Sequence, residues 1–75
     1  MSDVSELVRM ANQIADFFGP YPEDETIAGV TQHIRDFWTP AMRKQMAEHL
    51  AAGGAGLRPL ALKALNQMQP APAGA

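Results

Sequence analysis

Apolar residues recur every three to four positions over Val4–Phe18, the spacing of an amphipathic helix. Asp3 stands where its side chain can cap the first free amides, with Glu6 three residues later as in a capping box. We expect the helix to end at Gly19, in a left-handed conformation, because Pro20 cannot continue it. The predicted apolar face consists of Val4, Leu7, Val8, Ala11, Ile14, Ala15 and Phe18, and Met10 and Phe17 widen it on one side.

A second helix is predicted from residue 23, because Glu23–Glu25 place negative charge where the free amides of a first turn favour it. Pro40 disfavours a helical conformation at Thr39, so this helix should end near Trp38. Thr39 is then suited to cap a third helix, of which Pro40 is the first residue. The narrow apolar stripe of the second helix is Ile27, Val30, Ile34, Phe37 and Trp38.

The third helix is predicted to end at Gly53-Gly54, and Pro59 is predicted to begin a short fourth helix. Apolar residues of the fourth segment occupy an arc of about 200°, roughly twice what a helix on the rim of a small protein needs. This surplus predicts that another chain covers part of the segment. The apolar residues of the third helix are Met42, Met46 and Leu50, and those of the fourth are Leu60, Ala61, Leu62, Ala64, Leu65 and Met68.

The expected fold is therefore all-α, a small bundle of three amphipathic helices plus a short fourth C-terminal helix. Residues 1–68 form a single helical domain, and residues 69–75, a Pro/Ala tail with nothing to bury, should be disordered.

Length and composition narrow the class of protein. A chain of 75 residues makes one small domain with a modest core. The absence of cysteine excludes disulfides, thiolate metal sites and a thiol nucleophile, and the net charge of −2 argues against nucleic-acid binding. No secretory signal and no apolar run of roughly 20 residues is visible, so a cytoplasmic protein is expected.

Residues capable of catalysis are few. His33 and His49 are the candidates for metal or acid–base chemistry, and neither belongs to a metal-binding spacing such as His-x-x-x-His. No Gly-x-Ser-x-Gly elbow occurs, and the glycines at 53, 54 and 56 precede no Gly-Lys-Ser/Thr. The sequence thus predicts no catalytic, cofactor-binding or metal-binding residue.

The strongest candidate for an interaction site is the corner between the second and third helices. Trp38 either staples this corner internally or anchors an interface, since Trp, Met and Arg are enriched at the centres of protein contacts. Arg35, Arg43 and Lys44 form a modest basic cluster around it, interpreted as a solvated face or as the counterpart of an acidic partner. The predicted partner-binding residues are Trp38, Pro40, Met42, Arg43, Leu57, Pro59, Leu60 and Leu62.

Three blocks of sequence carry a family resemblance: MANQIADFF at residues 10–18, HI at 33–34 with FWTPAMR at 37–43, and GGAGLRPL at 53–60. In this order they resemble the small delta subunit of soluble NAD-dependent formate dehydrogenases, from about Leu7 to Leu65. The resemblance implies an accessory subunit without a redox centre of its own. It implies a catalytic alpha subunit with a molybdenum or tungsten bis-molybdopterin guanine dinucleotide centre and iron–sulfur clusters, and beta and gamma subunits that carry FMN, further clusters and the NAD site.

The function expected from the sequence is therefore docking on, and stabilisation of, the catalytic molybdopterin subunit. One alternative is a transient assembly chaperone that aids insertion of the molybdenum cofactor into that subunit. Another is a small helix-turn-helix regulator, against which the acidic balance of the chain argues.

Overall fold

The computed structural model describes residues 3–69, which form four helices and no strand. The helices are α1 (Val4–Phe18), α2 (Glu23–Phe37), α3 (Pro40–Ala51) and α4 (Pro59–Gln67). The predicted all-α class and the helix order are confirmed. Of the predicted disordered tail, residues 70–75 lie outside the described part of the chain.

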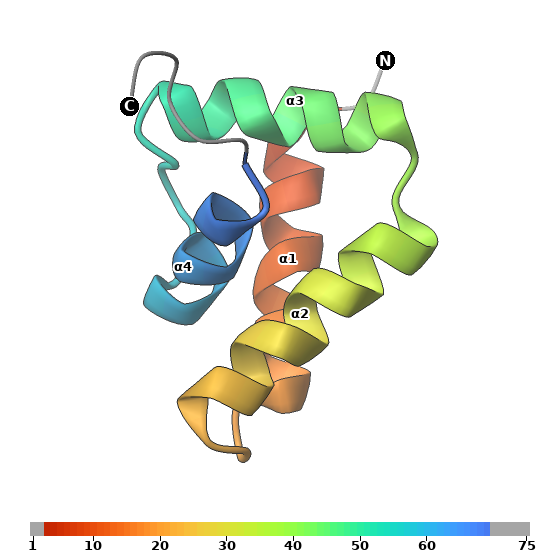
Figure 1. The fold of residues 1–75 in the computed structure, drawn as a ribbon. Coiled ribbons are helices and arrows are strands. Elements are labelled where there is room, and N and C mark those ends of the chain that lie inside the picture. Colours follow the sequence, from red (N-terminus) through yellow and green to blue (C-terminus); the bar gives the residue numbers. More distant parts are fainter. Residues whose placement is uncertain (1–2, 70–75) are drawn as a thin grey trace, which may run out of the picture.

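The helices are arranged so that α1 and α4 each contact all three other helices (Figure 1). In the figure α2 crosses α1 obliquely, α3 spans one end of the assembly, and α4 lies beside α1 on the side opposite the α2–α3 connection. A helix with three neighbours needs a wider apolar face than a helix with one or two. This arrangement decides how much of each predicted apolar face is covered.

The N-terminal cap of α1 forms in part as predicted. The Ser5 backbone N–H donates a 3.0 Å hydrogen bond to Asp3 Oδ1, which lowers the pKa of the Asp3 carboxyl. The reciprocal bond of a capping box is not made, because the Glu6 carboxylate pairs with Arg9 one turn later. The expected left-handed Gly19 is also wrong: its φ is −55°, and the chain leaves α1 through a right-handed turn before Pro20.

The α2–α3 corner follows the predicted chemistry closely. Thr39, which precedes Pro40, is extended with ψ 159°, as predicted, and Trp38 is extended as well with ψ 139°, so that α2 ends at Phe37. The Met42 N–H donates a 3.2 Å hydrogen bond to the Thr39 hydroxyl, and Pro40 is the first residue of α3. The sequence therefore positions the indole of Trp38 at the point where the chain changes direction.

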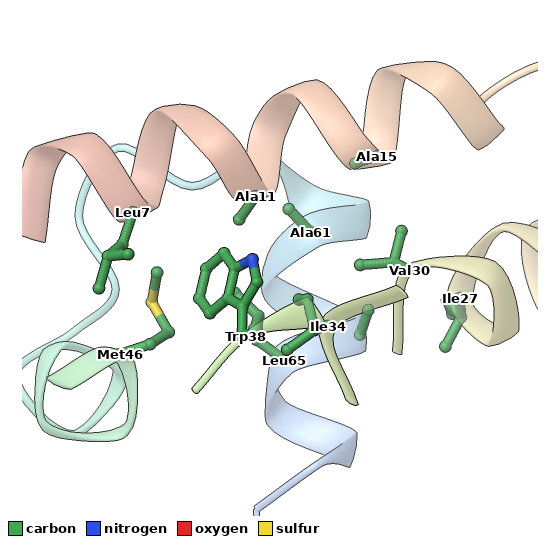
Figure 2. Packing of buried hydrophobic residues seen from close by; sticks show 11 residues of the cluster. Leu7, Ala11, Ala15, Ile27, Val30, Ile34, Trp38, Met46, Ala61 and Leu65 are labelled. Carbon is green, nitrogen blue, oxygen red and sulfur yellow. The ribbon is translucent and has the colours of Figure 1, made fainter. Parts of the chain in front are cut away.

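Trp38 lies in the middle of the hydrophobic core (Figure 2). Its side chain is 5% exposed, and the indole is surrounded by side chains from all four helices. Met46, one of the apolar residues predicted for the third helix, is 1% exposed and belongs to this core. The labelled neighbours of the indole in the figure are Leu7 and Ala11 of α1, Ile34 of α2, Met46 of α3, and Ala61 and Leu65 of α4.

The wide apolar arc of α4 is covered mainly by this chain, contrary to the expectation that another chain is needed. Ala61, Ala64 and Leu65 are buried, and Leu60 and Leu62 are half-buried. The expectation treated α4 as a helix on the rim, whereas it packs against α1, α2 and α3 together. A wide apolar face on a short helix can thus mark a central position in the monomer.

The segment between α3 and α4 is held against α1 by Asn12. The Asn12 amide donates a 3.0 Å hydrogen bond to the Gly56 carbonyl and accepts one of 2.9 Å from the Arg58 N–H. Arg58 also forms an ion pair with Asp16, whose hydrogen bond raises the pKa of the guanidinium. Because Asn12 satisfies both a donor and an acceptor of this segment, it fixes the position from which α4 starts.

The turn between α1 and α2 brings the two helices into close contact at Gly29. The hydroxyl of buried Thr26 lies 2.7 Å from the Phe18 carbonyl and 3.1 Å from that of Tyr21, and donates to them. The ring of Phe18 lies on Gly29, where an added Cβ would come within 2.6 Å of a ring carbon. The Phe18 ring can pack here only because Gly29 has no side chain.

We predict that Gly29→Ala lowers the free energy of unfolding by about 1–3 kcal/mol, because the methyl group overpacks the Phe18 ring. In an uncrowded helix the same change stabilises by about 0.5–1 kcal/mol. Urea unfolding followed by Trp38 fluorescence measures the difference. The double variant Gly29→Ala/Phe18→Leu should lose less than the sum of the single losses, and a net gain for Gly29→Ala alone would contradict the packing.

Candidate interaction surface

An apolar hollow, here called the aromatic cleft, opens between α1, α2 and the start of α3. Its volume is about 420 Å³. No charged side chain lines it, and its polar groups are the Gln13 amide and the His33 imidazole. The lining residues are Met10, Gln13, Ile14, Phe17, Phe18, His33, Phe37, Trp38 and Met42.

Two phenylalanines of this cleft are left open to solvent. Phe17 of α1 is 74% exposed and Phe37 of α2 is 71% exposed. Each belongs to a pair of adjacent aromatic residues: Phe17 and Phe18 lie in α1, where adjacent side chains point about 100° apart, and Trp38 follows Phe37 in an extended conformation just beyond α2. One member of each pair therefore faces inward, Phe18 and Trp38, while the other stays at the edge of the apolar face.

Ring contacts hold the exposed phenylalanines in place. The Phe17 and Phe18 rings meet edge to face with centroids 5.0 Å apart. The Phe37 ring lies against the His33 imidazole, with centroids 4.6 Å apart. Such contacts contribute about 0.5–1.5 kcal/mol each, less than burial of a whole phenylalanine side chain. The Phe17 and Phe37 rings are thus held in position but remain largely hydrated. A protein surface that covered them would be stabilised by the removal of their apolar area from water.

The predicted interaction residues of the α2–α3 corner do not all lie on one surface. Trp38 and half-buried Met42 line the aromatic cleft from below. Pro40 is exposed at the start of α3, and exposed Arg43 lines a different hollow on the other side of Trp38. Because Trp38 is buried in the monomer, it acts here as a core residue and offers little side-chain surface of its own.

The predicted interaction residues near α4 lie elsewhere and serve largely the fold of this chain. Gly54, in the left-handed conformation with φ 67°, leaves room that Leu57 and Leu62 fill, since an added Cβ would lie 3.6 and 2.8 Å from their methyl carbons. Pro59 and half-buried Leu60 line a shallow hollow of about 560 Å³ between α1 and α4. These four residues are not brought together with the aromatic cleft.

Phe17 and Phe37 were not among the predicted interaction residues. The sequence contained the signal: Met10 and Phe17 widen the α1 face on one side, and Phe37 lies at the edge of the α2 stripe beside His33. On a helical projection both edges carry an aromatic residue next to a polar one, Gln13 or His33. The sequence alone did not show that the Phe17 edge of α1 and the Phe37 edge of α2 line the same cleft.

The two histidines occupy separate sites. His33 contacts Phe37, whereas His49 Nε2 lies 2.8 Å from the Ala55 carbonyl near the end of α3. Within residues 3–69, no group of three or more His, Asp or Glu side chains is arranged to hold a metal ion. Over the same residues, no helix has the length and apolarity that crossing a membrane requires.

Comparison with known proteins gives one result. The model of a family described as the NADH-dependent formate dehydrogenase delta subunit FdsD matches residues 6–65. No curated protein and no solved structure matches the chain. The matched range extends from the first turn of α1 into α4, and so includes every residue of the aromatic cleft.

We predict that Phe17→Gln and Phe37→Gln each change the free energy of unfolding by no more than about 1 kcal/mol, because only ring-edge contacts are lost. Trp38→Ala should cost about 3–5 kcal/mol, because it opens a cavity among four helices. Thermal unfolding followed by circular dichroism compares the three variants. Equal losses would mean that the exposed phenylalanines are part of the core after all.

Proposed function

The chain belongs to the family of the NADH-dependent formate dehydrogenase delta subunit. From this membership we propose that it is a non-catalytic accessory subunit. In this role it docks on the catalytic subunit of such a complex and stabilises it. The redox chemistry lies in the partner subunits. These carry the bis-molybdopterin guanine dinucleotide centre, iron–sulfur clusters and FMN. The chain itself has no cysteine with which to ligate a cluster.

The aromatic cleft is the observation that supports this function. Exposed Phe17 and Phe37 form the rim of an apolar hollow whose floor reaches the core residue Trp38. A small-molecule site converges several polar groups on its ligand, whereas this cleft presents only Gln13 and His33. Protein contacts instead bury aromatic and methionine side chains at their centres, which is the composition found here.

Docking stabilises the partner through mass action. A subunit that binds the folded partner and not the unfolded one adds RT ln(1 + [L]/Kd), about 2.7 kcal/mol at a hundred times Kd. Burial of two largely hydrated phenylalanine rings supplies part of that affinity, at about 25 cal/mol for each Å² of apolar surface removed from water. The chain thus contributes contact area and not chemistry.

A transient assembly chaperone would use the same cleft, so the two roles differ in when the partner is released. We expect this chain to remain in the mature, active formate dehydrogenase in a fixed ratio to the catalytic subunit. Quantitative mass spectrometry of enzyme purified through a tag on the catalytic subunit measures that ratio. Its absence from active enzyme, together with its presence on cofactor-free catalytic subunit, would favour the chaperone.

We predict that Phe17→Gln/Phe37→Gln reduces recovery of the catalytic subunit with the tagged chain by more than tenfold, because the apolar contact loses its centre. The readout is capture from the protein's own cells, followed by immunodetection of the catalytic subunit. Tyr21→Gln is the matched control, since Tyr21 is 55% exposed and does not line the cleft. Full recovery with the double variant, at unchanged helix content, would exclude the aromatic cleft as the docking surface.

A further inference from the structure

A second hollow, here called the basic hollow, shares the lining residue Trp38 with the aromatic cleft. It is formed by α2, α3 and α4 and has a volume of about 160 Å³. Two arginines, Arg35 and Arg43, are among its lining residues, and both are exposed. The lining residues are Ile34, Arg35, Trp38, Arg43, Met46, Leu65, Met68 and Gln69.

The two arginines of the basic hollow have no counter-ion among residues 3–69. The other two described arginines are paired, Arg9 with Glu6 and Arg58 with Asp16. Asp36, which follows Arg35 in sequence, accepts a 2.9 Å hydrogen bond from Gln32. Two positively charged residues therefore line one small hollow, and no carboxylate of residues 3–69 forms an ion pair with either.

Interaction with the helix dipole explains the position of Arg35 but not that of Arg43. Arg35 lies in the last turn of α2, where a cation interacts favourably with the carbonyl end of the helix. Arg43 lies in the first turn of α3, a turn without acidic residues, where a cation is disfavoured by the same effect. A bound anion would interact favourably with both side chains and with this end of α3.

The floor of the hollow strengthens such an interaction. Ile34, Met46 and Leu65 are each no more than 2% exposed and form an apolar floor. Charges close to a low-dielectric surface are screened less by water than charges on an open surface. The planar guanidinium group donates two parallel hydrogen bonds to a carboxylate, which makes arginine suited to this ligand.

We propose that the basic hollow is a carboxylate-binding site that receives acidic side chains of the partner subunit docked on the aromatic cleft. This inference rests on the proposed function. Trp38 lines both hollows, so a partner that covers the α2–α3 corner contacts the apolar cleft and the two arginines at once. The partner surface is accordingly an apolar segment with Asp or Glu residues along the side that faces α4.

The test removes the two charges and follows the salt dependence of the complex. Tagged wild-type chain and Arg35→Gln/Arg43→Gln are used to capture the catalytic subunit from the protein's own cells over a series of NaCl concentrations. Arg9→Gln/Lys63→Gln is the matched control, because it removes the same net charge from exposed positions that do not line the hollow. Circular dichroism establishes that all three chains are equally helical.

We expect the Arg35/Arg43 variant to recover about tenfold less catalytic subunit at low salt, and its recovery to depend less on salt than that of wild type. The control should behave as wild type. Equal recovery and equal salt dependence for the two double variants would overturn the carboxylate site while leaving the proposed function intact. Failure of the wild-type chain itself to recover the catalytic subunit would instead overturn the proposed function, and this inference with it.

Discussion

Burial of the Trp38 indole is the constraint on which the rest of the structure depends. A side chain at the end of α2 can be enclosed only if α1, α3 and α4 all approach it, and all four helices contribute neighbours to it. The chain achieves this with small residues, Ala11 and Ala61, where helices come close, and with Met46 opposite. For a domain this small, one large aromatic residue shared by every helix supplies a substantial part of the core.

The same packing explains why the molecule has an exposed aromatic surface. Phe18 and Trp38 point toward the core, and their neighbours Phe17 of α1 and Phe37 at the end of α2 remain exposed at its edges. The turn held by Thr26 brings those edges to one cleft. Folding of this chain therefore leaves an exposed aromatic surface, which is the surface proposed above to dock on a partner subunit.

The two hollows that Trp38 lines give the α2–α3 corner two kinds of surface, one apolar and one basic. One is apolar and without charged residues, whereas the other carries Arg35 and Arg43 above an apolar floor. An apolar contact supplies affinity, and a paired charge supplies orientation and partner choice. Because Trp38 lines both hollows, the proposed partner would contact the apolar and the basic surface together.

The sequence by itself determined the helices: Asp3, Thr39, Pro40 and Pro59 act on their immediate neighbours, so their effects can be derived without knowledge of the fold. It also supplied the family resemblance, which the match over residues 6–65 confirms. Tertiary structure alone decided which apolar residues remain uncovered. The α4 leucines were expected to need another chain to cover them, yet within this chain Leu65 is buried and Leu60 and Leu62 are half-buried, while Phe17 and Phe37 stay exposed. Local spacing gives the width of an apolar face, but its exposure depends on how many helices pack against it, and that is a property of the whole fold.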